Sequence, residues 1–389
     1  MNILLVGSKC RFLQLLTDKL DKEGHRVFLL TAEDKSVRTS KKIFETYHFA
    51  YDNPCIREVL EGVRPDVTVF MGAYDTGFLW GKGSSTASAY TSGLFQLLMN
   101  ETAGNVGRFL YLSSEEVFGG EYTQDISCEE NCAAYTVRAQ AIAAGEELCR
   151  SYFNMGYETI VLRLDHLYGE PLTGAEARDI CARMSVEGLE TGEIRVNPHN
   201  RVALLHYSDA VEFLYAVITA KKMTYGVYQI SSGETISVRS AAEFVAAELE
   251  GVKVVEDTGR ERMEPVLSNQ RFAEEFGIRI VHKPETEIGR EAAYIRQHAS
   301  SFVRTQSRKK GWSRFGERSR EAVRAMIPFA ENLLCFLPFF LLNNWMAGSA
   351  YFQNIDFYLL YVLLFAITYG QQQATFSSIL AVAGYLAVQ

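Results

Sequence analysis

The chain has 389 residues and a formal net charge of −8, with 39 basic and 47 acidic residues. Because single domains usually hold about 100–200 residues, we expect two or three structural units. The lack of long basic runs before residue 300 argues against a nucleic-acid-binding protein. Seven cysteines without a CxxC pair argue against a zinc centre, so we expect no bound metal and reduced thiols.

The first half of the chain alternates short apolar runs with segments of helical periodicity. Strands of four to six apolar residues without polar alternation suit a parallel sheet covered on both faces. This rhythm predicts a doubly wound, Rossmann-like α/β domain over residues 1–165. The expected strands are Ile3–Val6, Val27–Leu30, Val67–Met71, Phe109–Leu112 and Thr159–Leu164, with helices over Phe12–Leu20 and from about Tyr135.

After residue 165 the pattern becomes mixed. It predicts a smaller α+β substrate domain over residues 166–300. Helices are expected at Ala177–Glu190, Asp209–Ala220 and Val238–Leu249, and strands at Val202–His206 and Val227–Ile230.

Residues 301–325 form a basic stretch that precedes a strongly apolar C-terminus. From Ser301 to Arg324 eight basic residues stand against two acidic ones, whereas beyond Arg324 the only charged residues are Glu331 and Asp356. A basic segment beside an apolar run is typical of a juxtamembrane linker. A solvated basic helix without a partner is the alternative.

The apolar C-terminus, residues 326–389, predicts two to three transmembrane helices at Met326–Trp345, Ile355–Tyr369 and Thr375–Val388. The last run ends at Gln389 without a polar cap, so we expect a truncated membrane span. No signal peptide is expected at the N-terminus. Because basic residues stay on the cytoplasmic side, the preceding domains should lie at the inner face of the cytoplasmic membrane. A helical hairpin buried against another protein is the alternative.

The first thirty residues, MNILLVGSKCRFLQLLTDKLDKEGHRVFLL, read as strand, tight turn, helix and strand. Here the chain resembles the NAD-dependent epimerase/dehydratase branch of the extended short-chain dehydrogenase/reductase superfamily. The family's three-glycine loop holds the pyrophosphate of NAD or NADP at a helix N-terminus. Only Gly7 matches it, and Cys10 and Leu13 occupy the other two places. Side chains there obstruct the pyrophosphate and separate helix from strand, so we expect weakened cofactor binding.

The same resemblance assigns further residues to the cofactor side. Thr31 stands where an acidic residue would accept the ribose 2′-hydroxyl. With Lys35 or Arg38 it would favour a 2′-phosphate, and a polar loop without a ligand is the alternative. The cofactor-binding positions implied by the resemblance are Gly7, Lys9, Thr31, Asp52, Gly72 and Ala73.

The segment RFLYLSSEEVFG, Arg108–Gly119, is similar to the family strand that carries the catalytic Ser or Thr. The resemblance makes Ser114 the hydroxyl that hydrogen-bonds the reacting oxygen of the substrate. Glu115 and Glu116 approximate the acid pair that moves protons in the 4,6-dehydratases. The alternative is that these two glutamates are turn residues.

The family pairs a catalytic Tyr with a Lys four residues later, because the ammonium lowers the pKa of the phenol. In AYTVRAQA, Tyr135 keeps the first place and Ala139 occupies the second. Arg138 stands one residue early, about 100° around the helix, and could replace the Lys only if the backbone shifts. A buried aromatic without a catalytic role is the alternative for Tyr135.

Two later segments resemble the substrate side of the family. LRLDHLYGEP, Leu162–Pro171, contributes Tyr168, and RVALLHYSDAVEFL, Arg201–Leu214, contributes Arg201 and His206. The resemblance implies that Arg201 grips the nucleotide diphosphate as a bidentate donor. The matching motifs extend over about 300 residues in the family's order.

A nucleotide sugar, with a UDP-hexose expected, is therefore the implied ligand, and a homodimer is the implied assembly. The first hypothesis is a membrane-anchored protein with degraded catalysis that binds or senses a nucleotide sugar for surface glycan or exopolysaccharide production. An active 4-epimerase or 4,6-dehydratase is the second, and a non-catalytic dimerising scaffold is the third. Intact substrate-side motifs beside altered cofactor-side motifs favour the first hypothesis.

Overall fold

The computed structural model divides the chain into two compact units, Met1–Arg304 and Thr305–Gln389. The residues it describes are 1–32, 40–48, 56–75, 84–103, 107–119, 125–172, 179–257, 266–277, 279–303, 329–345, 356–369 and 371–388. The predicted basic linker, residues 301–325, therefore lies almost wholly outside the described residues.

The first unit is built on a seven-stranded sheet in the order β10-β6-β5-β4-β1-β2-β3, with every neighbouring pair parallel. The predicted Rossmann-like α/β fold is confirmed. The strands are β1 (Asn2–Val6), β2 (Arg26–Thr31), β3 (Ile43–His48), β4 (Val67–Phe70), β5 (Arg108–Ser114), β6 (Thr159–Leu164) and β10 (Val227–Ile230).

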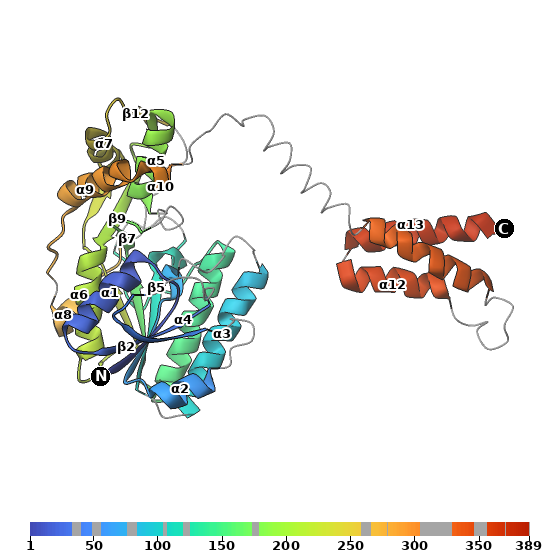
Figure 1. The fold of residues 1–389 in the computed structure, drawn as a ribbon, viewed down its shortest axis with the longest axis horizontal. Helices are drawn as coiled ribbons and strands as arrows, with labels where there is room; N and C mark the ends of the chain where they lie inside the picture. Colours follow the sequence, from blue (N-terminus) through green and yellow to red (C-terminus); the bar gives the residue numbers. More distant parts are fainter. Residues whose placement is uncertain are drawn as a thin grey trace. The chain divides into compact units, whose positions relative to one another are not determined.

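Helices cover both faces of this sheet (Figure 1). Alternate residues of β1 point into the two layers: Ile3 packs in one cluster and Leu4 in the other. Each buried leucine contributes roughly 1.5–3 kcal/mol of transfer free energy. The first layer holds α1 (Arg11–Lys22) and α6 (Tyr207–Thr219), and the second holds α2 (Arg57–Val63), α3 (Ser84–Ala103) and α4 (Val137–Asn154).

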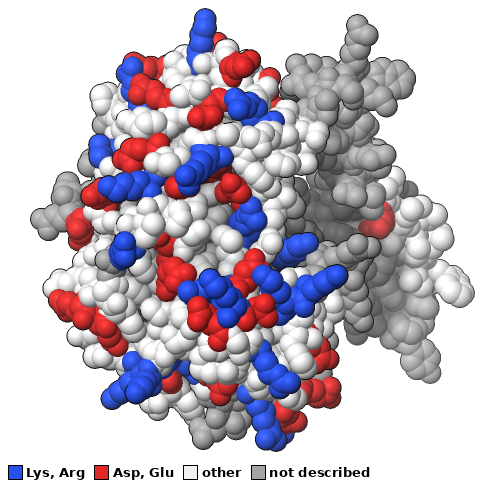
Figure 2. Space-filling model, turned by 60° about the vertical axis from the view of Figure 1, so that its left-hand side comes forward, with Lys and Arg blue, Asp and Glu red and all other residues white. Residues whose placement is uncertain are grey.

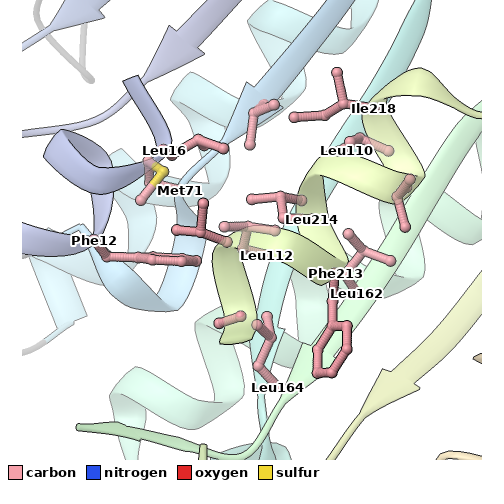
Figure 3. Close-up of a cluster of buried hydrophobic side chains, with 14 of the residues drawn as sticks. Phe12, Leu16, Met71, Leu110, Leu112, Leu162, Leu164, Phe213, Leu214 and Ile218 are labelled. Carbon is pink, nitrogen blue, oxygen red and sulfur yellow. The ribbon is translucent and has the colours of Figure 1, made fainter. Parts of the chain in front are cut away.

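The first layer is the larger core (Figure 3). Phe12 and Leu16 of α1 and Leu214 of α6 meet Leu110 and Leu112 of β5, and all five side chains are buried. Phe12 and Leu16 stand four residues apart and so lie on one face of α1, as the helical repeat of the sequence predicts. This packing fixes the N-terminus of α1 above the carboxyl ends of the strands.

Two smaller sheets form the second lobe of this unit: β11-β9-β7 and β12-β8. The prediction of a smaller mixed α/β region is confirmed. The strands are β7 (His166–Tyr168), β8 (Glu193–Val196), β9 (Arg201–His206), β11 (Thr235–Ser237) and β12 (Lys253–Glu256). The helices of the lobe and its surroundings are α5 (Ile180–Thr191), α7 (Val238–Glu248), α8 (Gln270–Phe276), α9 (Pro284–Gln297) and α10 (Ala299–Phe302).

Charged side chains of both signs are interspersed on the face shown in Figure 2. Among the described residues, Arg239 pairs with Glu243 and Glu256, and Lys19 pairs with Glu212. Such exposed pairs contribute little individually, about 0–1 kcal/mol.

The described residues of the second unit form three helical segments: residues 329–345, α12 (Phe357–Tyr369) and α13 (Gln371–Val388). Phe336 stacks on Tyr358 at 6.1 Å between ring centroids, and the Tyr361 hydroxyl donates to the carbonyl of Asn332 at 3.1 Å. In the part of the chain that the structure describes, no helix has both the length and the apolar character of a membrane span.

Candidate functional site

A cavity of about 150 Å³ lies where the carboxyl ends of the central strands meet the N-terminal regions of α1 and α4. In doubly wound sheets this edge is the usual ligand site. Five of the residues expected from the sequence line it: Ala73, Ser114, Glu115, Glu116 and Arg138.

Ser114 and the two glutamates stand at the end of β5. The short helix η3 (Glu115–Val117) begins there, and the Ser114 Oγ caps it by accepting from the Glu116 N–H at 3.3 Å. The cap holds the hydroxyl at the cavity wall, and the next two residues extend that wall. The strand end therefore brings together one hydroxyl and two carboxyl groups.

Arg138 supplies the positive charge of the cavity. Its Nη1 lies 2.9 Å from Glu116 Oε1, and its Nη2 donates to the Ala73 carbonyl at 2.5 Å. One helical turn later α4 carries Ile142, which is fully buried. This face of α4 thus presents a guanidinium at the cavity and an apolar residue one turn later.

Tyr135 lies elsewhere. It precedes α4, its side chain is 76% exposed, and it is not among the described residues that line the cavity. Its ring covers Gly119, where an added Cβ would come within 2.4 Å of Tyr135 Cδ2. Ala139, at the place of the family Lys, is buried. The structure therefore does not bring Tyr135 together with Ser114.

His166 is a site residue that the sequence reading missed. It follows β6 and lines the cavity, and its Nδ1 lies 3.1 Å from Oε1 of the buried Glu115. An imidazole and a carboxyl in contact can exchange a proton with a ligand. The sequence alone does not show that His166 and Glu115 are close, because their contact depends on β6 and β5 being neighbours in the sheet.

The glycines at the expected cofactor loop have structural reasons to be glycine. A Cβ on Gly7 would lie 2.7 Å from Met71 Cγ, so this glycine permits the close approach of β1 and β4. Gly72 has φ +52°, and a Cβ there would lie 2.0 Å from the Leu112 carbonyl oxygen. These contacts explain both glycines without a bound cofactor.

The donors that would hold a pyrophosphate are already engaged. Cys10 caps α1, its Sγ accepting from the Leu13 N–H at 3.4 Å. The Ser8 N–H donates to Asp75 Oδ1 at 3.2 Å, and Asp75 is buried. A carboxylate beside this loop repels a diphosphate at the place where the family binds one.

Tyr74 fills the space next to this loop. The helix η1 (Gly72–Tyr74) directs its hydroxyl to the carbonyls of Leu164 and Asp165, at 3.1 and 3.2 Å. Its ring meets the edge of Phe12, which stacks on Tyr207 at 6.0 Å between centroids. Burial, reinforced by nearby carboxylates, raises the pKa of Tyr74 well above its ordinary value, so the phenol stays protonated.

The other residues expected to bind the cofactor give no further evidence for a bound NAD or NADP. Thr31 is buried at the end of β2, and Lys9 is exposed. Asp52, Lys35 and Arg38 lie outside the described residues. Among the described residues, the engaged loop donors, the buried carboxylate of Asp75 and the ring of Tyr74 do not fit a bound NAD or NADP.

The residues expected to hold the substrate lie in the second lobe and are not among the described residues lining the cavity. Arg201 is exposed, and its Nε and Nη2 donate to the Thr235 hydroxyl at 2.8 Å and carbonyl at 2.6 Å. His206 caps α6 through Ser208 and stacks on His282 at 4.5 Å. Tyr168 is fully buried. Of these, only Arg201 offers its charged group to solvent.

Comparison with solved structures places the fold among enzymes of nucleotide sugars. The dTDP-glucose 4,6-dehydratase of Bacillus anthracis, solved with NAD, matches with a TM-score of 0.64 at 15% identity, over 77% of this chain and 98% of that one. The UDP-glucose 4-epimerase of Thermotoga maritima, solved with UDP-glucose, matches with a TM-score of 0.64 at 17% identity, over 77% and 100%. A search of curated proteins gives no match.

The sequence also matches the model of the NAD dependent epimerase/dehydratase family over residues 13–231, more than half of the chain. The chain belongs to this family, as its motifs led us to expect. The likeness to individual structures, below 20% identity, establishes the fold and leaves the activity of this chain to its own residues.

Proposed function

We propose that the protein binds a nucleotide sugar and does not turn it over, and that it reports this ligand in the production of a surface glycan or exopolysaccharide. The observation that carries the proposal is the cofactor side of the cavity, where Tyr74, Asp75 and Cys10 occupy the space and the donors of the family's dinucleotide site. Family chemistry begins with hydride transfer to a nicotinamide, so a chain without that cofactor has no first step.

The second support is the loss of the Tyr–Lys pair that transfers protons in the family. Arg138 is held by Glu116 and by the Ala73 carbonyl. A guanidinium stays protonated at physiological pH and cannot act as a base. The exposed Tyr135 has no cation one turn along the helix, because Ala139 stands there.

The ligand class comes from the family and from two solved relatives that contain UDP-glucose, an epimerase and MoeE5. Arg201 is the residue of this chain best suited to a diphosphate, because it is exposed and its guanidinium is oriented by Thr235.

Calorimetric titration of the full chain with UDP-glucose, UDP-galactose and dTDP-glucose tests the proposal. We expect one of them to bind without added NAD, and chromatography to find no epimer or keto-sugar after prolonged incubation. Arg201→Ala should weaken binding about tenfold or more, whereas Arg195→Ala, which removes an exposed arginine of the same lobe, should not. Product formation would exclude the non-catalytic proposal, and failure of all three sugars to bind would exclude a nucleotide-sugar ligand.

We further propose that the second unit attaches the protein to the cytoplasmic face of a membrane. Its support is the distribution of side chains: Leu334, Leu337 and Leu363 are exposed, while Asn332 and Ser377 are fully buried. This arrangement, apolar outside and polar inside, suits a hydrocarbon surrounding.

Cell fractionation checks the attachment. The full chain should sediment with membranes and resist a high-salt wash, and the chain ending at Arg304 should remain in the supernatant. Sedimentation of both forms, or of neither, would contradict attachment through the second unit.

A further inference from the structure

A second group of reactive side chains lies in the smaller lobe, and one member, Asp179, also lines the cavity beside Ser114. Asp179 and Cys181 begin α5, and Glu291 stands on α9, which packs against α5. One ligand atom from each of the three lies within 4.8 Å of the others. Over a hundred residues separate Cys181 from Glu291, which is why cysteine spacing in the sequence gave no sign of this trio.

Asp179 uses only half of its carboxylate in the fold. Its Oδ1 caps α5 by accepting from the Cys181 and Ala182 N–H groups at 3.0 and 2.9 Å. Its Oδ2 is buried and makes no hydrogen bond of good geometry with the described part of the chain, and the Glu291 carboxyl is its neighbour. The cap therefore fixes the carboxylate and leaves one oxygen available.

Glu291 is more unusual, because its side chain is 1% exposed and its carboxyl oxygens make no hydrogen bond of good geometry with the described residues, although the Asp179 carboxyl and the Gly169 N–H lie beside it. The carboxyl groups of Glu291 and Asp179 lie within 4.8 Å of each other. Two carboxyl groups this close and this little exposed need either a shared proton or a cation between them.

An independent observation comes from Tyr168 of β7. Its ring is fully buried in the same cluster as Cys181, and its hydroxyl is without a hydrogen-bond partner in the described structure. Buried tyrosine hydroxyls normally have a partner. A further polar atom beside the trio thus lacks one.

We propose that Asp179, Cys181 and Glu291 bind a divalent cation of the zinc type. A thiolate with two carboxylates suits zinc, whereas magnesium and calcium select oxygen ligands alone. Three protein ligands leave a fourth position open. Asp179 also lines the cavity beside Ser114, whereas Cys181 and Glu291 are buried behind it.

Titration of the metal-free full chain with Co²⁺, followed by displacement with Zn²⁺, tests the site. We expect one ion per chain and an ultraviolet thiolate-to-cobalt absorption band that Zn²⁺ abolishes. Cys181→Ser should remove the band, and Cys149→Ser, which alters a buried cysteine of α4, should retain it. Absence of the band in the unaltered chain, or its persistence in Cys181→Ser, would overturn the proposal.

A second measurement separates the cation from a shared proton. Glu291→Gln keeps the size of a protonated carboxyl, so it should fold without metal and have a Tm close to that of the metal-free parent. Zn²⁺ should then raise the Tm of the parent and leave that of Glu291→Gln unchanged. An equal Zn²⁺ effect on both chains, or no effect on the parent, would assign the pair to a shared proton.

Discussion

Arg138 and Glu116 form an ion pair at the wall of the cavity, with Nη1 2.9 Å from Oε1 and each side chain about one-third exposed. The pair joins the start of α4 to the end of β5 and so holds together two elements that in the family carry the catalytic groups. Because both side chains are partly exposed, the ion pair contributes about 1 kcal/mol or less to the free energy of unfolding.

Replacing Arg138 with Met removes this pair and the hydrogen bond to the Ala73 carbonyl. We expect the free energy of unfolding to fall by about 1–2 kcal/mol, measured by urea denaturation. Arg195→Met, which breaks an exposed pair with Glu193, is the control and should change it by less than about 0.5 kcal/mol. Equal effects of the two changes would contradict the role given to Arg138.

The ion pair of Arg163 on β6 and Glu146 on α4 is buried. Arg163 Nη2 lies 2.7 Å from Glu146 Oε2, and the Ser113 hydroxyl donates to the other carboxylate oxygen. Glu146→Ala leaves a buried guanidinium without its counter-charge and should cost about 3–5 kcal/mol in unfolding experiments. Glu147→Ala, at the adjacent exposed position, should have little effect. A small loss for Glu146→Ala would show that Arg163 finds another partner.

His206 should make stability fall in acid. Burial, followed by His282, lowers its pKa from 6.5 to about 4. At a pH between these two pKa values, His206 is protonated in the unfolded chain and neutral in the folded chain. The free energy of unfolding therefore decreases as the pH falls from about 6.5 to about 4.

His206→Asn tests this prediction because its side-chain oxygen can still cap α6. The variant should lose part of the acid sensitivity, on the order of a few kcal/mol over that interval, in denaturation curves taken at several pH values. His298→Asn alters an exposed histidine and serves as the control. An unchanged pH profile in His206→Asn would refute the assignment.

NAD and NADP should not stabilise the protein. A ligand that binds only the folded state raises the Tm, by an amount that grows with its concentration above Kd. We therefore expect no Tm change at millimolar NAD+, NADH, NADP+ or NADPH. A nucleotide-binding epimerase of the family provides the positive control. A concentration-dependent rise would show that Tyr74 and Asp75 move aside.

The predicted homodimer can be tested at the exposed apolar residues of α3, Phe95 and Met99. If two chains pair through the layer that holds α2, α3 and α4, the double variant Phe95→Glu/Met99→Glu should be monomeric. Its mass measured by light scattering should then be half that of the parent chain. The pair Glu58→Gln and Glu61→Gln on the neighbouring α2 is the control. A parent chain that is itself monomeric would contradict the predicted homodimer.

Much of the fold was predictable because buried parallel strands are marked by continuous apolar runs. Thr159–Leu164 and Val227–Ile230 match β6 and β10 residue for residue. The edge strand β3 was missed, since Ile43–His48 is half-exposed and lacks such a run. The short strand β7 was missed because three residues carry no periodicity.

The site was predictable only where a motif fixes the local backbone. Ser114, Glu115 and Glu116 follow a strand directly, and the structure places them at the cavity. The position of Tyr135 depended on helical register across an insertion, and in the structure Arg138 lines the cavity whereas Tyr135 is exposed outside it. Tyr74, His166 and Asp179 come from three separate connections, so their meeting depends on tertiary packing that spacing does not encode.

The carboxylate of Asp75 accepts from the Ser8 N–H at the place where the family binds the diphosphate of its dinucleotide. A protein of this family that excludes dinucleotides is insensitive to the ratio of oxidised to reduced nicotinamide in the cell. On the proposed function, its occupancy then follows the supply of sugar precursor alone, and glycan production is coupled to carbohydrate supply independently of respiratory state.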